Sequence, residues 1–176
     1  MAAQVDYFLQ IEGVEGESTD SAFPNLIQVQ HWTWSEENTG HWGVGSGAGA
    51  GKVQMGDFIF GMFTNKASPK LFLMCATGQH IPNAKLICRK SGNGQQQFLT
   101  ITFTDGLVSS YVTRGSQTPA ETAKGSVHIE AAGILPYDEI KINFARIEIE
   151  YRAQQDDGSL GAVVKAGYDL KLNAAV

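Results

Sequence analysis

The chain has 176 residues, of which 43% are hydrophobic and 18% are charged, and its formal net charge is -5. This length suits a single domain spanning 1–176, and the acidic balance argues against binding nucleic acid through its phosphates. The charged fraction is below the rough quarter that soluble domains carry, which indicates that other chains cover part of the surface.

The N-terminus does not look like a secretory signal. Residues 1–6 lack a basic stretch followed by a long apolar core. No apolar run approaches the roughly 20 residues of a membrane-spanning helix. We therefore expect a protein that folds in the cytosol, does not insert into a membrane, and is exported, if at all, without a cleaved signal peptide. The two cysteines, Cys75 and Cys88, are expected to be buried reduced thiols.

The first third of the chain predicts three strands. Alternating apolar residues predict strands over 7–12, 26–35 and 53–63. In the second and third of these, the apolar residues change from one face of the strand to the other, which a strand with one buried face should not do. For 26–35, this indicates either a β-bulge near Gln30–His31 or a second buried face.

One short helix is predicted over 68–78. Ser68 stands at the N-cap position, Pro69 at the first helical position and Gly78 just past the end.

The rest of the chain again predicts strands. Their expected ranges are 84–90, 97–103, 107–112, 138–154 and 164–172, with a short strand or an insertion at 126–131. Asn93–Gly94 and Asp105–Gly106 lie between successive strands and are typical of hairpin turns. The apolar face changes a third time within 138–154. About eight or nine strands and one helix favour a mainly β fold, a small antiparallel barrel or sandwich.

No group of residues indicates catalysis, a cofactor or a metal. Gly45 to Lys52 lacks the spacing of a phosphate-binding loop, because Ser46 stands where a glycine is needed and Val53 follows the lysine. No histidine has a second ligand at metal-binding spacing. Glu148 and Glu150 share one strand face with flanking arginines, which favours a charge ladder over a glycosidase pair.

The three tryptophans leave one binding hypothesis open. Trp32, Trp34 and Trp42 are able to stack on sugars, so a small secreted carbohydrate-binding β-sandwich is one alternative. Tryptophan serves more commonly in cores and interfaces.

Short stretches along the whole chain match a known family in their order and spacing. They are Tyr7–Ile11, Gly16–Ser18, Ile27–Trp34, Gly49–Val53, Asp57–Phe58, Asn65–Leu71, Gly78–Leu86, Val108–Ser110, Ile142–Ala145 and Gly167–Leu170. In these stretches the chain resembles the Hcp family, the haemolysin-coregulated proteins that form the inner tube of bacterial type VI secretion systems. The segment 118–136 fits the pattern least well, so no role is assigned to it.

The resemblance implies two packed β-sheets that form a small barrel with one helix beside it. It also implies a homohexameric ring with a wide pore, and rings that stack into a tube. The expected partners are further copies of the chain, a contractile sheath, a valine-glycine repeat spike protein and effector cargo carried in the lumen. The protein would be assembled in the bacterial cytoplasm and then secreted. A stand-alone secreted effector is a further alternative.

The resemblance also implies site residues. The glycine-rich loop would reach the adjacent subunit or the next ring. Its ring-interface candidates are Trp42, Gly43, Val44, Gly45, Ser46, Gly47, Gly49 and Lys52. Thr33, between two tryptophans, is the candidate for contact with cargo in the lumen. The strands that change face would bury one face in their own barrel and part of the other against a neighbour.

Overall fold

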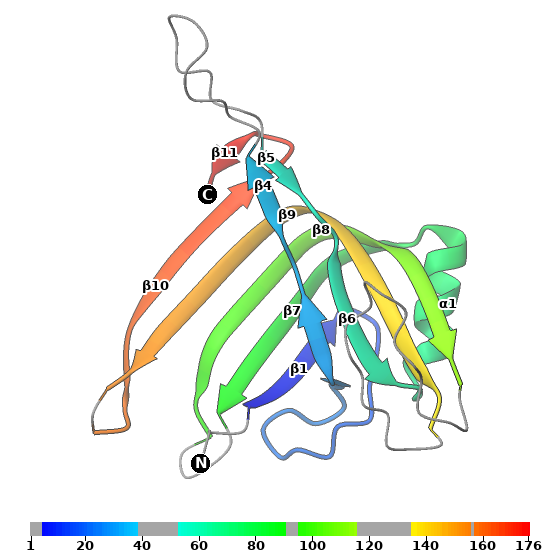
Figure 1. Ribbon diagram of the computed structural model, residues 1–176, viewed down its shortest axis with the longest axis horizontal. Coiled ribbons are helices and arrows are strands. Elements are labelled where there is room, and N and C mark those ends of the chain that lie inside the picture. Colours follow the sequence, from blue (N-terminus) through cyan, green and yellow to red (C-terminus); the bar gives the residue numbers. More distant parts are fainter. Residues whose placement is uncertain (1–4, 39–52, 91–94, 116–134, 156) are drawn as a thin grey trace, which may run out of the picture.

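The computed structural model describes residues 5–38, 53–90, 95–115, 135–155 and 157–176. Within them the chain forms antiparallel strands and a single helix, which confirms the predicted fold class (Figure 1). The elements in chain order are β1 (Val5–Ile11), β2 (Ile27–Val29), β3 (His31–Thr33), β4 (Glu36–Asn38), β5 (Val53–Met55), β6 (Phe58–Phe63), α1 (Ser68–Thr77), β7 (His80–Lys90), β8 (Gln97–Arg114), β9 (Tyr137–Gln154), β10 (Leu160–Asp169) and β11 (Ala174–Ala175).

Nine of these strands belong to one strongly curved sheet. Its main path is β11-β10-β9-β8-β7-β1-β2, and β6 pairs with both β9 and β3. Because β3 follows β2 directly, the sheet curls back toward its own first strands as an incomplete barrel. β4 and β5 form a separate two-stranded ribbon. Figure 1 shows this ribbon at the upper end, with β10 on one side of the barrel and α1 on the other.

Aromatic side chains fill the inside of the barrel. The ring of Phe58 lies 4.5 Å from that of Phe103 and 5.8 Å from that of Phe60, measured between centroids. Leu9 and Ile140 are also fully buried. Burying a side chain of this size stabilises the fold by about 1.5–3 kcal/mol, so this cluster holds the curved sheet together.

The strands predicted over 26–35 and 53–63 are each two short strands, which explains their changes of face. Gln30 separates β2, which pairs with β1, from β3, which pairs with β6. Gly56 lies in the break between β5 and β6, where its amide donates to the Ser35 carbonyl at 2.9 Å. Each piece has its own partner, so the alternation starts afresh in each. The irregularity predicted near Gln30–His31 is therefore a break.

The apolar side chains of β8 and β9 change from one face of the strand to the other at the same level of the sheet, so the two strands still bury a common side. The inward side shifts by one residue between Phe103 and Gly106 of β8 and between Phe144 and Ile147 of β9, while their register is unchanged. The rings of Phe103 and Phe144 still pack together, at 4.9 Å. The hairpin predicted at Asp105–Gly106 is wrong. Asp105, with a φ of 54°, lies within a continuous strand of 18 residues, because β7 and β9 pair with β8 on both sides of it.

Helix α1 lies where it was predicted, but Ser68 has another role. Gly78 ends the helix with a left-handed φ of 65°, and its amide donates to the Met74 carbonyl. Ser68 is not the N-cap, because the helix begins at this residue and Ala67 takes the cap position. Its hydroxyl donates instead to Asp138 Oδ2 of β9 at 2.5 Å. A tertiary partner 70 residues away cannot be read from a capping pattern.

Two turns complete the comparison with the sequence. The strand predicted over 164–172 corresponds to β10, which ends at Asp169 because the Asp169 carboxylate accepts the amides of Lys171 and Leu172 and closes a turn. The turn predicted at Asn93–Gly94 lies outside the described residues. The strands on either side of it, β7 and β8, do pair antiparallel.

Candidate assembly interface

At the open edge of the barrel sheet, β9 and β10 pair over residues that we call the wing, 146–154 and 160–169. The wing is continuous with the rest of the sheet, because β9 also pairs with β8 from Arg146 to Tyr151. One face of the wing is apolar. Its cross-strand pairs are Ile147 with Tyr168, Ile149 with Ala166, and Tyr151 with Val164. Toward the tip this face is uncovered, since Tyr151 is 46% exposed and Val164 is 69% exposed.

The opposite face of the wing is a ladder of ion pairs. Arg146 Nη2 donates to Glu148 Oε1 at 2.6 Å, and Lys165 Nζ lies 3.1 Å from Glu150 Oε1. The hydrogen bond from Arg146, with the nearby Lys165, holds the pKa of Glu148 below its ordinary value. The predicted charge ladder is confirmed. Because these ion pairs satisfy the polar face, the apolar face is the one left uncovered toward the tip by the described residues.

A groove of about 470 Å³ lies between the wing and the β4–β5 ribbon. It is lined by Trp34, Glu36, Glu37, Asn38, Val53, Met55, Ile147, Ile149, Ala166, Gly167 and Tyr168. Trp34 packs against Phe144, and its Nε1 is buried without a hydrogen-bond partner among the described residues. The floor of the groove therefore offers mainly apolar contact.

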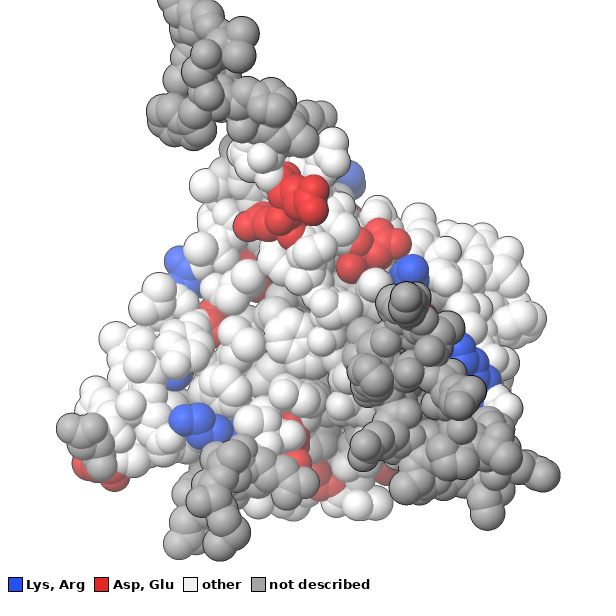
Figure 2. Space-filling view, in the orientation of Figure 1, with Lys and Arg blue, Asp and Glu red and all other residues white. Residues whose placement is uncertain are grey.

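The rim of the groove is acidic. Glu36 and Glu37 are both exposed on β4, and Figure 2 shows acidic side chains gathered over the ribbon. The volume is within the roughly 300–1,000 Å³ of binding pockets. An exposed apolar surface with a polar rim is typical of an interaction site.

The ring-interface residues predicted from the sequence are not described by the structure. Trp42, Gly43, Val44, Gly45, Ser46, Gly47, Gly49 and Lys52 all lie outside the described residues. The described residues on either side, Asn38 and Val53, pair with each other and line the groove. The predicted loop therefore starts and ends at the groove.

Thr33 lies on the outer face of the barrel. It pairs with Ile59 of β6, which pairs in turn with Lys141 of β9. Thr33 is exposed, whereas the flanking Phe58 and Phe60 of β6 point into the core. Thr33 therefore belongs to a surface row that crosses three strands, away from the groove.

The described tryptophans pack onto the core. Trp32 lies 6.2 Å from the ring of Tyr7 and 6.4 Å from that of Phe58, and Trp34 lies 6.4 Å from that of Phe144. Both are half-buried, so they do not form an open sugar-stacking platform.

The groove was not predicted from the sequence. Its signal was present, because the face change at Ile147 and the alternation of Val164, Ala166 and Tyr168 place apolar side chains on one side of the wing. A pattern along the chain does not show that no other element covers that side.

The described residues contain no group of three or more histidine, cysteine, aspartate or glutamate side chains able to hold a metal ion. In the same part of the chain, no helix is long and apolar enough to cross a membrane. Both cysteines are free, with Cys88 buried and Cys75 half-buried. Burial raises the pKa of the Cys88 thiol to about 12, which makes that thiol unreactive.

A family model described as "Type VI secretion system effector, Hcp" matches residues 8–151. The chain belongs to the Hcp family. Protein hcp1 of Pseudomonas aeruginosa is 34% identical over 171 residues, which cover 96% of this chain and 97% of that protein. The crystal structure of Hcp1 from Salmonella typhimurium has a TM-score of 0.74 and 30% identity, covering 98% of this chain and 99% of its own.

A further structure of a type six secretion system protein has a TM-score of 0.86 at 24% identity, covers 98% of this chain and 100% of its own, and supports the fold. The family resemblance predicted from the sequence is confirmed. As a member of the Hcp family, the protein is a subunit of the type VI secretion tube. The carbohydrate-binding and stand-alone effector hypotheses are not favoured.

Proposed function

We propose that the chain acts as one domain, 1–176, that assembles into hexameric rings, and that these rings stack into a secreted tube. Its work is association rather than catalysis. The observation that carries this proposal is the uncovered apolar face of the wing and its groove, on a protein whose charged fraction is only 18%. A monomer exposing such a surface would be prone to associate.

The remaining partners of the tube are inferred from the family resemblance. The tube would hold effector cargo in its lumen, with Thr33 as a residue that contacts it, and would meet a valine-glycine repeat spike protein and a contractile sheath. The residues Trp42, Gly43, Val44, Gly45, Ser46, Gly47, Gly49 and Lys52 would contact the adjacent subunit or the next ring. Assembly would take place in the bacterial cytoplasm, and export would follow without a cleaved signal peptide.

Native mass spectrometry and electron microscopy of the purified protein test the proposal together. We expect a species with six times the monomer mass and ring-shaped particles with a central pore. A folded chain that stays monomeric at every concentration would contradict the proposal. A monomer that binds glycans would instead restore the carbohydrate-binding hypothesis.

A further inference from the structure

Helix α1 is apolar on two faces, although only one of them is buried. Leu71 and Met74 point into the core. On the other side Pro69, Phe72, Leu73 and Ala76 are exposed and follow the i, i+3, i+4, i+7 spacing of a helical stripe. Phe72 is 57% exposed and Leu73 is 54% exposed. A helix that faces solvent normally carries polar residues there, so this stripe indicates a missing partner.

We call the exposed residues Phe72, Leu73 and Ala76 the α1 knob. Phe72 has its ring edge-on to Tyr111 of β8, 6.0 Å away, which supports the knob from beneath. Figure 1 shows α1 at one side of the barrel and the β4–β5 ribbon at its upper end. Because α1 is held against the core by Leu71 and Met74, one chain cannot place its own knob in its own groove.

A ring of identical subunits needs two different surfaces on each chain that fit one another, because its contacts run head to tail. The knob and the groove supply such a pair: one is an apolar projection and the other is an apolar depression. Phe72 and Leu73 are adjacent exposed apolar residues, and both lie on a helix that is packed against the core. They therefore project together as one rigid unit.

The charges around the two surfaces are also of opposite sign. Glu36 and Glu37 edge the groove. Lys70 is exposed on α1 one turn before the knob, whereas the charge of Lys66, just ahead of the helix, is paired with Glu15 at 3.2 Å. Opposite charges at the rim of an interface favour one orientation of the partners.

We propose that the α1 knob of one subunit docks in the groove of the next subunit, with Lys70 facing Glu36 and Glu37. The inference rests on the proposed ring and names the surfaces that join its subunits. The knob side chains meet Trp34 and the apolar face of the wing, so the contact buries apolar area on both sides.

Charging the knob tests this contact. Leu73→Glu places a carboxylate opposite an acidic rim and an apolar floor. We expect subunit association to weaken roughly thirty-fold, the effect of losing an interfacial hot spot. Circular dichroism of the monomer should be unchanged, because Leu73 is more than half exposed. The matched control is Val163→Glu, 41% exposed on the charged face of the wing, which should assemble like the wild type.

A charge exchange tests the orientation. Lys70→Glu should weaken ring formation, and Glu37→Lys in the same chain should restore part of it. The docking would be overturned if the double variant showed no recovery of ring formation and the Leu73→Glu variant still formed rings.

Cross-linking between differently labelled chains identifies the occupant of the groove. In a Cys75→Ala background, one chain carries Leu73→Cys and another carries Ala166→Cys. With an added thiol oxidant, the mixture should give a disulfide-linked pair containing one chain of each kind, and neither chain alone should give it.

Two results would overturn the inference while leaving the proposed ring in place. The first is intact rings without this cross-link. The second is a cross-link from Ala166→Cys to a chain carrying Val44→Cys, which would make the glycine-rich segment the occupant. Failure of the wild type to form rings would instead overturn the proposed function itself.

Discussion

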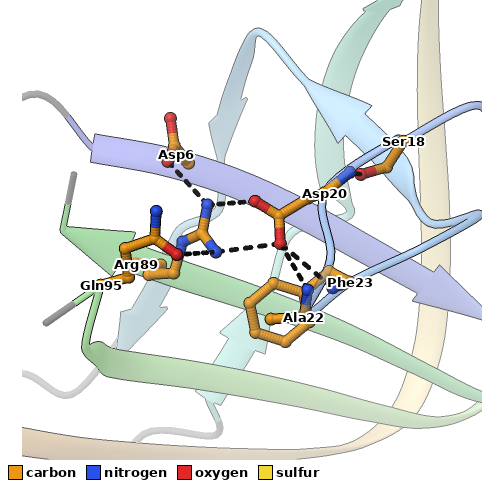
Figure 3. Close-up of polar contacts among 7 residues, drawn as sticks. All are labelled: Asp6, Ser18, Asp20, Ala22, Phe23, Arg89 and Gln95. Atoms are coloured by element: carbon orange, nitrogen blue, oxygen red, sulfur yellow. Dashed lines mark hydrogen bonds and ion pairs between the residues drawn. The ribbon is translucent and has the colours of Figure 1, made fainter. Parts of the chain in front are cut away.

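At the scale of single residues, Arg89 of β7 is a buried charge with an unusual set of neighbours (Figure 3). Its guanidinium lies beside the packed pair of rings of Phe8 and Phe23, 5.1 and 5.4 Å from their centroids. It donates to both carboxylate oxygens of Asp20, at 2.6 and 3.0 Å, and to Asp6 at 3.1 Å. These bonds fasten the segment between β1 and β2 to the barrel.

Asp20→Asn should make the monomer less stable near neutral pH. The hydrogen bond from Arg89 lowers the pKa of Asp20, so the ionised carboxylate stabilises the fold above its unfolded pKa of about 3.9. That stabilisation is lost as the pH falls through the lower, folded value. Urea unfolding at a series of pH values should therefore show that the difference in free energy of unfolding between wild type and variant disappears below about pH 4. A difference that does not change with pH would rule this out. Glu12→Gln, at an exposed carboxylate, is the control.

At the scale of elements, the start of α1 is tied to β9 through a buried carboxylate. Asp138 is fully buried, and its two oxygens accept the hydroxyls of Ser68 and Thr64 at 2.5 and 3.0 Å. Ser68→Ala removes one of these donors inside the protein, which should cost about 1–3 kcal/mol. Urea unfolding measures the loss.

Thr77→Ala provides the comparison for Ser68→Ala. The Thr77 hydroxyl donates to the Leu73 carbonyl at the exposed end of the same helix, so its loss should cost no more than about 0.5 kcal/mol. Equal effects of the two variants would argue against the link to β9. A capping role for Ser68 would also make its loss independent of Asp138→Asn, whereas the structure predicts strong coupling between the two variants.

The contrast between these elements and their prediction shows what a sequence can supply. Apolar alternation located β1 and β9, the latter in spite of its change of face, and Gly78 marked the end of α1 through its left-handed backbone. The Asp105–Gly106 pair gave a wrong prediction of a hairpin turn. Such a pair can also lie within a continuous strand when both neighbouring strands continue past it. The groove could not be predicted, since it depends on the wing and the ribbon leaving a face uncovered.

At the scale of the whole molecule, the described residues form a buried core and, apart from it, apolar surfaces that are exposed to solvent. The barrel buries its aromatic cluster, whereas the β4–β5 ribbon and α1 lie outside it and the wing forms the open edge of its sheet (Figure 1). The exposed residues of these surfaces, such as Leu73 and Val164, should therefore be open to change without loss of the fold.

Deleting Gly43 to Gly49 tests this separation. Asn38 and Val53 are paired partners at the end of a ribbon that is not part of the nine-stranded sheet. Residues 39–42 and 50–52 remain to connect them, which is ample for a hairpin. We expect circular dichroism and the melting temperature of the monomer to be unchanged, and ring or tube assembly to weaken in native mass spectra and micrographs. Replacing 43–49 with glycine and serine at the same length separates the role of Val44 and its neighbours from that of loop length. Loss of soluble, folded protein in the deletion variant would show that this segment belongs to the fold and not to assembly.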